Sequence, residues 1–185
     1  MSNFTDVMVD IETNGTDPHN NSVIQICAVK FNLQTRDVSS DVFNRCLNPK
    51  PRRAVDQDTM VNFWGKIPDV YKSIVARMEP PETVMRDLVR WVGSDELRFW
   101  GKPITFDFSF IDSYFKDYGI VNPFFWRTAR DLNSYIAGLR HNAEHPDTSY
   151  VEFEGQAHDA FYDTFHQIKM LFEESDRNVQ ASVVA

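Results

Sequence analysis

The residues best suited to chemistry in this sequence are two carboxylates, Asp10 and Glu12, at the end of a short apolar run. The run 5–11 alternates apolar and polar residues, which indicates a β-strand. Residues two apart on a strand leave the same face of the sheet, so the two carboxylates lie side by side. Like charges at that spacing repel, and a bound divalent cation such as Mg²⁺ or Mn²⁺ removes the cost. The plainer alternative is a solvated acidic pair, so the assignment depends on the rest of the chain.

Further acidic and imidazole positions could complete such a site. Asp107 follows the short apolar run 97–100 and begins a helix, where the helix dipole favours a carboxylate. His158 and Asp163 lie near the start of the last helical segment. Five residues on a helix turn through about 140°, so these two share a pocket only if His158 precedes the first turn. Asp159, four residues before Asp163, shares its face and is the main rival ligand, with helix capping as its ordinary role.

Positioning these groups calls for a mixed α/β fold. Three strand-like runs joined by short turns predict an antiparallel meander, and helical periodicity then alternates with one more short strand. The fold class expected is α/β, with a mixed sheet that begins as an antiparallel meander and is flanked by α-helices. The predicted strands span 5–11, 22–31, 36–47 and 97–100, and the predicted helices span 58–64, 68–78, 82–92, 107–118, 128–139 and 159–174. A single domain is expected over 1–174, with a polar tail, 175–185, that frays.

Composition places the chain among ordinary globular proteins. Its 185 residues, 42% of them hydrophobic, are enough for one sizeable core. The net charge of −8 argues against a broad basic surface for duplex DNA, although carboxylates gathered around metal ions would account for part of it. Cys27 and Cys46 lack metal-ligand spacing, which predicts reduced core thiols. With no leader-like start and no apolar run of membrane length, a cytoplasmic location is expected.

The acidic residues and the histidine occur in an order that resembles a known superfamily. Asp-Ile-Glu-Thr at 10–13, Phe-Asp at 106–107, and His158 followed by Asp163 are similar to the DEDD 3′–5′ exonucleases, in their histidine-containing, DnaQ-like (DEDDh) branch. The similarity covers roughly residues 7–171. It implies an RNase H-like fold and metal-dependent hydrolysis of nucleic acid from the 3′ end.

Other segments resemble a smaller group in that branch, the phage exonucleases of the DexA type and the related RNase AS. These segments are Phe-Trp-Gly-Lys at 99–102, Asn-Pro-Phe at 122–124, Arg-Asp-Leu at 130–132, His-Asp-Ala at 158–160 and Asp-Thr with Phe-Trp at 58–64. Proofreading members carry His-Asn where this chain has Lys102-Pro103, a departure from the proofreading subunits but not from the chemistry. A phage-encoded enzyme of this kind would act in the host cytoplasm.

The resemblance implies a role for each acidic position. Asp10, Glu12, Asp107 and Asp163 would hold two divalent cations, Mg²⁺ or Mn²⁺, because four carboxylate charges balance two such ions. His158 would act as general base on the attacking water, and the product would be a nucleoside 5′-monophosphate. The expected partner is a single-stranded DNA or RNA 3′ end, without a membrane partner, and a homodimer is left open.

Substrate contacts are predicted from residue type. Residues after the acid pair offer hydrogen-bond donors, and aromatic rings offer stacking worth about 1–3 kcal/mol per base. Lys102 could meet phosphate, with ordinary surface charge as the default. The predicted substrate-binding residues are Thr13, Asn14, Gly15, Phe63, Trp64, Phe108 and Arg130.

Two alternatives stay open at this point. A nucleic-acid-binding module of the same fold without turnover is disfavoured because every catalytic position is filled. An RNase H-like endonuclease leaves the placement of His158 unexplained. DNA and RNA are not distinguished, because the deciding contact is to the 2′-hydroxyl.

Overall fold

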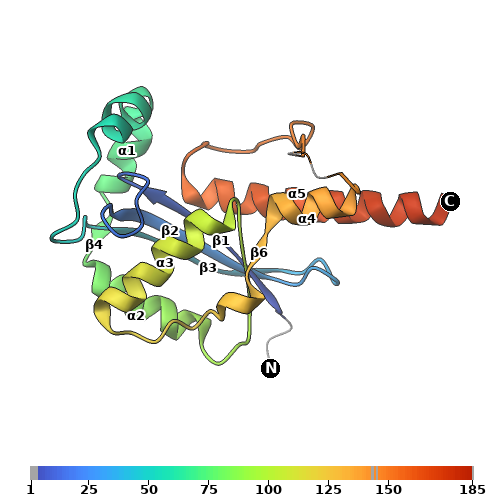
Figure 1. The fold of residues 1–185 in the computed structure, drawn as a ribbon, viewed down its shortest axis with the longest axis horizontal. Helices are drawn as coiled ribbons and strands as arrows, with labels where there is room; N and C mark the ends of the chain where they lie inside the picture. Colours follow the sequence, from blue (N-terminus) through green and yellow to red (C-terminus); the bar gives the residue numbers. More distant parts are fainter. Residues whose placement is uncertain (1–3, 143, 145, 185) are drawn as a thin grey trace.

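A computed structural model describes residues 4–142, 144 and 146–184 of the chain. Its centre is a six-stranded mixed sheet in the order β4-β3-β2-β1-β5-β6 (Figure 1). The first three strands form the predicted antiparallel meander, and β5 and β6 then add in parallel. The strands are β1 (Asp6–Thr13), β2 (Val23–Phe31), β3 (Val38–Leu47), β4 (Met78–Glu79), β5 (Arg98–Gly101) and β6 (Arg130–Asp131). The predicted fold class, a mixed sheet flanked by helices, is confirmed.

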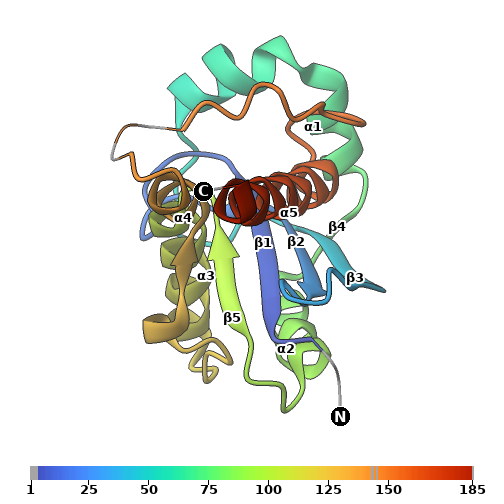
Figure 2. The same ribbon diagram turned by 90° about the vertical axis from the view of Figure 1, so that its right-hand side faces the viewer.

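Helices cover both faces of the sheet (Figures 1 and 2). Helices α2 and α3 pack against one face, and α4 and α5 pack against the other. The α-helices are α1 (Pro68–Val75), α2 (Pro81–Val92), α3 (Ile104–Tyr118), α4 (Leu132–Leu139) and α5 (Ala160–Val184). The short helices are the π-helix η1 (Thr59–Phe63) and the 3₁₀ turns η2 (Trp64–Lys66) and η3 (Trp126–Thr128). No helix in the described part of the chain is both long and apolar enough to span a bilayer.

Several element boundaries differ from the predicted ones, most of all around the helices that carry site residues. Helix α3 begins at Ile104, before the predicted start at 107, and α4 begins at Leu132 because the two residues before it pair with β5 as β6. Helix α5 continues past the predicted end at 174 to Val184, so the tail predicted to fray is helical up to that residue. This tail is polar but carries neither glycine nor proline, and polarity alone does not end a helix that has begun.

Strand β1 is buried on both faces, and its alternation decides where the two carboxylates point. Val7 and Val9 belong to the core beneath α2 and α3, whereas Met8 belongs to the core beneath α5. Asp10 and Glu12 follow Met8 at steps of two and therefore share its face. The carboxylates leave the end of β1 toward α5, which places the candidate site between this strand and that helix.

Candidate active site

A cavity of about 290 Å³ lies where β1 ends, between the β5–α3 turn and the start of α5. Its lining comes from three distant segments of the chain. The lining residues are Asp10, Ile11, Glu12, Lys102, Phe106, Asp107, His158, Asp163, His166, Gln167 and Met170. The four carboxylates and the histidine that the sequence predicts as catalytic residues therefore face one cavity, which we call the acidic cavity.

Asp107 reaches the acidic cavity from the first turn of α3. The backbone N–H of Ile11 donates to its Oδ1 at 3.3 Å, while its Oδ2 is buried without a hydrogen-bond partner among the described residues. Gly101 allows this close approach, since a Cβ there would lie 2.9 Å from Oδ2. Burial raises the pKa of Asp107 to about 7. A buried carboxylate oxygen without a donor is a suitable ligand for a cation.

The other three carboxylates are also held in a charge-repelling arrangement. Gln167 Nε2 donates to Asp10 Oδ1 at 2.7 Å and fixes its orientation. Burial first, and then the neighbouring carboxylates, raise the pKa values of Asp10 and Glu12 well above the usual range. Burial also raises the pKa of Asp163. Without a cation, each of these groups therefore resists ionisation.

The donor set fits hard divalent cations. Carboxylate oxygens of Glu12 and Asp163 and a ring nitrogen of His158 lie within 4.8 Å of one another. The unpartnered Oδ2 of Asp107 adds another oxygen ligand at the same cavity. Mg²⁺ and Mn²⁺ prefer such oxygen-rich sites, so this cavity suits either ion.

The raised pKa of Asp107 leads to a prediction for the protein in EDTA. Because the folded-state pKa lies above the unfolded value near 3.9, ionisation destabilises the fold progressively as pH rises from about 4 to about 7. Asp107→Asn, which keeps an acceptor for the Ile11 N–H, should remove its share of this slope and stabilise the protein at pH 7.5 by a few kcal/mol. Urea unfolding across this pH range, with Asp112→Asn on the exterior of α3 as control, measures the difference.

His158 is positioned by the turn that precedes α5. The helix begins at Ala160, so His158 lies before the first turn, as the spacing predicts. Its φ of 63° is in the left-handed region, which histidine adopts more readily than most residues. The backbone N–H of His158 donates to Asp163 Oδ2 at 2.8 Å, and its ring packs edge-to-face on Phe63 with centroids 4.8 Å apart. The imidazole therefore sits at the mouth of the acidic cavity.

Asp159, the rival ligand, points elsewhere. Its Oδ1 accepts hydrogen bonds from Gln25 Nε2 at 2.8 Å and from the backbone N–H of Phe161 at 3.0 Å. Its Oδ2 lies 3.6 Å from Arg77 Nη2. Asp159 thus caps α5 and ties the start of this helix to β2, and it does not line the acidic cavity.

A second cavity of about 400 Å³ adjoins the first, and the two share Ile11, Glu12 and Phe106. It lies between the end of β1 and the π-helix η1. The remaining lining residues are Thr13, Thr16, Asp58, Thr59, Asn62 and Phe63. An aromatic ring combined with hydroxyl, amide and carboxylate groups at this volume is typical of a small-molecule pocket. Two predicted substrate-binding residues, Thr13 and Phe63, line this second cavity.

Asn14 and Gly15 shape the turn after β1 and line neither cavity. Asn14 Oδ1 accepts the backbone N–H of Ser22 at 2.6 Å, and Thr13 Oγ1 donates to the carbonyl oxygen of Gly15 at 2.7 Å. A Cβ at position 15 would lie 2.3 Å from the side chain of Asn21, so the turn requires glycine there. These two residues hold the turn in place, and their role as direct substrate contacts stays a prediction.

Three other predicted contacts also lie away from both cavities. Trp64 is only 2% exposed and donates its indole N–H to the carbonyl oxygen of Thr13 at 2.9 Å. Phe108 packs edge-to-face on Phe99 with centroids 5.2 Å apart. Arg130 is exposed and donates to backbone carbonyls of neighbouring residues. None of the three faces either cavity, because residue type does not separate a core ring or a surface cation from one that faces a cavity, and their substrate contacts stay predictions.

The structure also adds cavity residues that the sequence did not single out. His166, Gln167 and Met170 follow Asp163 by three, four and seven residues on α5 and line the acidic cavity with it. That spacing defines one face of a helix, so a cavity role for Asp163 predicts that these three residues face the same cavity. Lys102, whose default role was surface charge, lines the same cavity from the β5–α3 turn.

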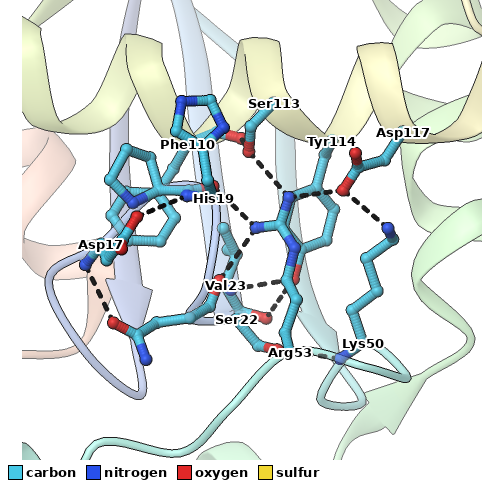
Figure 3. A network of polar contacts seen from close by, with 12 residues as sticks. Asp17, His19, Ser22, Val23, Lys50, Arg53, Phe110, Ser113, Tyr114 and Asp117 are labelled. Carbon is cyan, nitrogen blue, oxygen red and sulfur yellow. Dashed lines mark hydrogen bonds and ion pairs between the residues drawn. The ribbon is translucent and has the colours of Figure 1, made fainter.

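Arg53 holds the turn after β1 against α3 (Figure 3). Its Nη1 donates to the carbonyl oxygens of Pro18 and Asn21 at 2.9 and 2.8 Å. Its Nη2 donates to Ser113 Oγ at 3.0 Å and to Asp117 Oδ2 at 2.6 Å. The guanidinium therefore joins the β1–β2 turn, which follows the acid pair, to the helix that carries Asp107.

Arg53→Ala should lower the free energy of unfolding by about 2–4 kcal/mol, because it removes the donors to the carbonyl oxygens of Pro18 and Asn21 and to two side chains of α3. Urea denaturation measures this change. The matched control is Arg86→Ala, which removes an exposed guanidinium paired with Glu82 on α2 and should cost less than about 0.5 kcal/mol. Equal effects of the two substitutions would contradict the role assigned to Arg53.

Known structures share this fold. An E. coli exonuclease I–single-stranded DNA complex matches with a TM-score of 0.70 and 18% identity over 94% of this chain and 41% of that chain. Cell-death related nuclease 4 matches with a TM-score of 0.66 and 21% identity over 94% of this chain and 64% of that one. The nuclease domain of 3′hExo, a DEDDh family member bound to rAMP, matches with a TM-score of 0.63 and 12% identity over 95% and 94%. This chain spans less than half the length of the exonuclease I chain.

The chain has the RNase H-like nuclease fold of exonuclease I and of the 3′hExo nuclease domain, with a carboxylate-lined cavity at the end of β1. A family model described as the 3′–5′ exoribonuclease Rv2179c-like domain matches residues 5–173, and the chain belongs to this family. Comparison with curated proteins finds no match.

Proposed function

We propose that this chain is a metal-dependent 3′–5′ exonuclease that releases nucleoside 5′-monophosphates from single-stranded nucleic acid. The observation that carries the proposal is the acidic cavity, where carboxylates from β1, α3 and α5 meet beside the imidazole of His158. Membership in a 3′–5′ exoribonuclease family supports the same reaction. The proposed domain is 1–174, and the segments similar to the DexA-type exonucleases and RNase AS favour that group within the branch.

Five residues of the acidic cavity have a place in this reaction. The residues proposed to hold two Mg²⁺ or Mn²⁺ ions are Asp10, Glu12, Asp107 and Asp163. When bound, the ions supply Lewis-acid stabilisation of the phosphoryl and leaving oxygens and lower the pKa of water. His158 accepts the proton of the attacking water from the mouth of the cavity. Phe63 supports the imidazole through its edge-to-face contact, and the backbone of residue 158 is fixed by its hydrogen bond to Asp163.

The second cavity is the place for the terminal nucleoside, because Glu12 lines both cavities and a nucleoside there would have its phosphate next to the acidic cavity. Phe63 offers a ring face or edge to the base, while Thr13 and Asn62 offer polar groups. RNA is the first substrate to test, since the family is described as exoribonucleases. Single-stranded DNA is the second, since it is the ligand in exonuclease I complexes of the same fold.

Incubation with 5′-labelled single-stranded RNA and DNA in Mg²⁺ or Mn²⁺ tests the proposal. We expect a ladder shortened one nucleotide at a time from the 3′ end, with no products in EDTA. A circular single strand, which has no end, should stay intact. Cleavage of the circle would indicate an endonuclease, and tight binding without cleavage would indicate a binding module.

A further inference from the structure

Lys102 is the only lysine or arginine among the described residues that line the acidic cavity. It follows Gly101 at the end of β5, and its backbone lies beside Asp107. Its Nζ lies 3.7 Å from Met170 Sδ, and it forms no ion pair with any described carboxylate. An ammonium group is thus half-buried in a cavity of carboxylates with a sulfur atom as its polar neighbour.

The surroundings of this ammonium are anionic but not in contact with it. Asp10 and Asp163 line the same cavity as Lys102. Burial lowers the pKa of Lys102, and the charges of Asp163 and Asp10 act in the opposite direction. A lysine that served only as surface charge would extend into water, as Lys116 does on the exterior of α3. The space between the ammonium and these carboxylates belongs to the acidic cavity itself.

The charges of the loaded cavity require one more anion. Two divalent cations would balance the four carboxylates, and Lys102 would then leave a single positive charge that no other described residue of the cavity lining neutralises. A phosphodiester carries one negative charge and has oxygens that accept hydrogen bonds from an ammonium group. The charge of a substrate phosphate is therefore equal and opposite to the charge that the cavity leaves uncompensated.

We propose that Lys102 binds the phosphodiester that is cut, by donating from its ammonium group to a non-bridging oxygen of the 3′-terminal linkage. Lys102 is then a further catalytic residue, in the same cavity as His158. This inference rests on the proposed exonuclease function.

The test compares two short single-stranded oligonucleotides that differ only in their last linkage. One carries a charged, cleavage-resistant phosphorothioate and the other an uncharged methylphosphonate, and binding is measured with Ca²⁺ in place of Mg²⁺. Wild-type protein should bind the charged linkage more tightly than the uncharged one. In Lys102→Met the ratio of these two affinities should fall at least about tenfold. Lys102→Arg should retain most of this ratio, and Lys116→Met, the matched control, should retain all of it.

A second measurement separates this role from structural damage. Thermal shift with Mg²⁺ alone should show that Lys102→Met binds the ion as tightly as wild type or more tightly, because a competing cation is gone. Weaker binding of both Mg²⁺ and oligonucleotide would overturn the inference in favour of a structural role. An unchanged linkage preference in Lys102→Met, with wild type active on the 5′-labelled strands, would overturn it and leave the proposed function standing. If wild type shortens neither strand, the proposed function itself fails.

Discussion

Replacing Asp10 with asparagine should reduce nucleotide release by at least about a thousandfold and leave the fold intact. Loss of a residue that orients a metal ligand commonly costs about 10–100-fold, and loss of a ligand that faces the reacting phosphate should cost more. Asparagine retains an oxygen that can accept the Gln167 Nε2 hydrogen bond, so the geometry of β1 and α5 should persist. Single-turnover release of nucleotide from labelled RNA measures the loss.

The same substitution should raise stability when no metal is present. Burial and the neighbouring carboxylates raise the pKa of Asp10, so its ionised form destabilises the folded state at neutral pH. The melting temperature in EDTA at pH 7.5 should therefore increase with Asp10→Asn, while the increase that Mg²⁺ gives wild type should shrink.

Asp159→Asn is the matched control, since it removes one negative charge close to the cavity but keeps an oxygen to cap α5. Its activity should stay within a few-fold of wild type. If Asp159→Asn were as damaging as Asp10→Asn, the ligand assignment along α5 would have to be revised.

The part of the site that the sequence predicts is the part set by local geometry. Asp10 and Glu12 share a face because strand alternation requires it, whatever packs against the strand. Helix rotation would separate His158 from Asp163 if both were helical, so they can share a cavity only if His158 precedes the helix. This is the observed arrangement, because α5 begins two residues after His158. Each conclusion depends only on the residue repeat of one strand or one helix.

The part that sequence reasoning misses depends on packing between distant segments. Phe63 and Trp64 are adjacent aromatic residues with equal stacking potential, and their rings are in edge-to-face contact with centroids 4.9 Å apart. Trp64 is buried because it begins the 3₁₀ turn η2 and its indole N–H donates to the carbonyl oxygen of Thr13 in β1, whereas Phe63 ends the π-helix η1 and lines the second cavity.

Arg130 and Lys102 show the same limit for charged residues. Arg130 lies in β6, a strand of two residues that pairs with β5. Two residues are too few to show a strand periodicity in the sequence. Lys102 enters the cavity because β5 ends there beside β1. A cation in an exposed strand and a cation in a cavity therefore look alike until the sheet order is known.

Replacing His158 with asparagine should reduce the rate of hydrolysis by about 10²–10⁴-fold while metal binding is largely retained. Asparagine tolerates the left-handed φ of 63° at this position, and its backbone N–H can still donate to Asp163 Oδ2. Its amide cannot accept a proton from water, so the loss isolates proton transfer from positioning. Thermal shift with Mg²⁺ checks that the carboxylates still bind the ion.

The pH dependence of the rate provides an independent test of this base. Only a neutral imidazole accepts a proton, so a rate limited by chemistry should rise with pH as the base loses its own proton. Saturating Mg²⁺ keeps the four carboxylates ionised throughout, so they should not contribute to the rise. The residual rate of His158→Asn should lack the rise, and the same rise in the variant would exclude His158 as its source.

His166 is the imidazole that could be mistaken for this base, since it lines the same cavity and its Nδ1 has no hydrogen-bond partner among the described residues. Its ring packs against Phe153 with centroids 4.8 Å apart, whereas a ring nitrogen of His158 lies within 4.8 Å of carboxylate oxygens of Glu12 and Asp163. A base must reach water held beside those carboxylates, so His166→Asn should cost less than about tenfold. If His166→Asn removed the pH-dependent rise and His158→Asn did not, the general base would be His166, and His158 would serve only to close the mouth of the cavity.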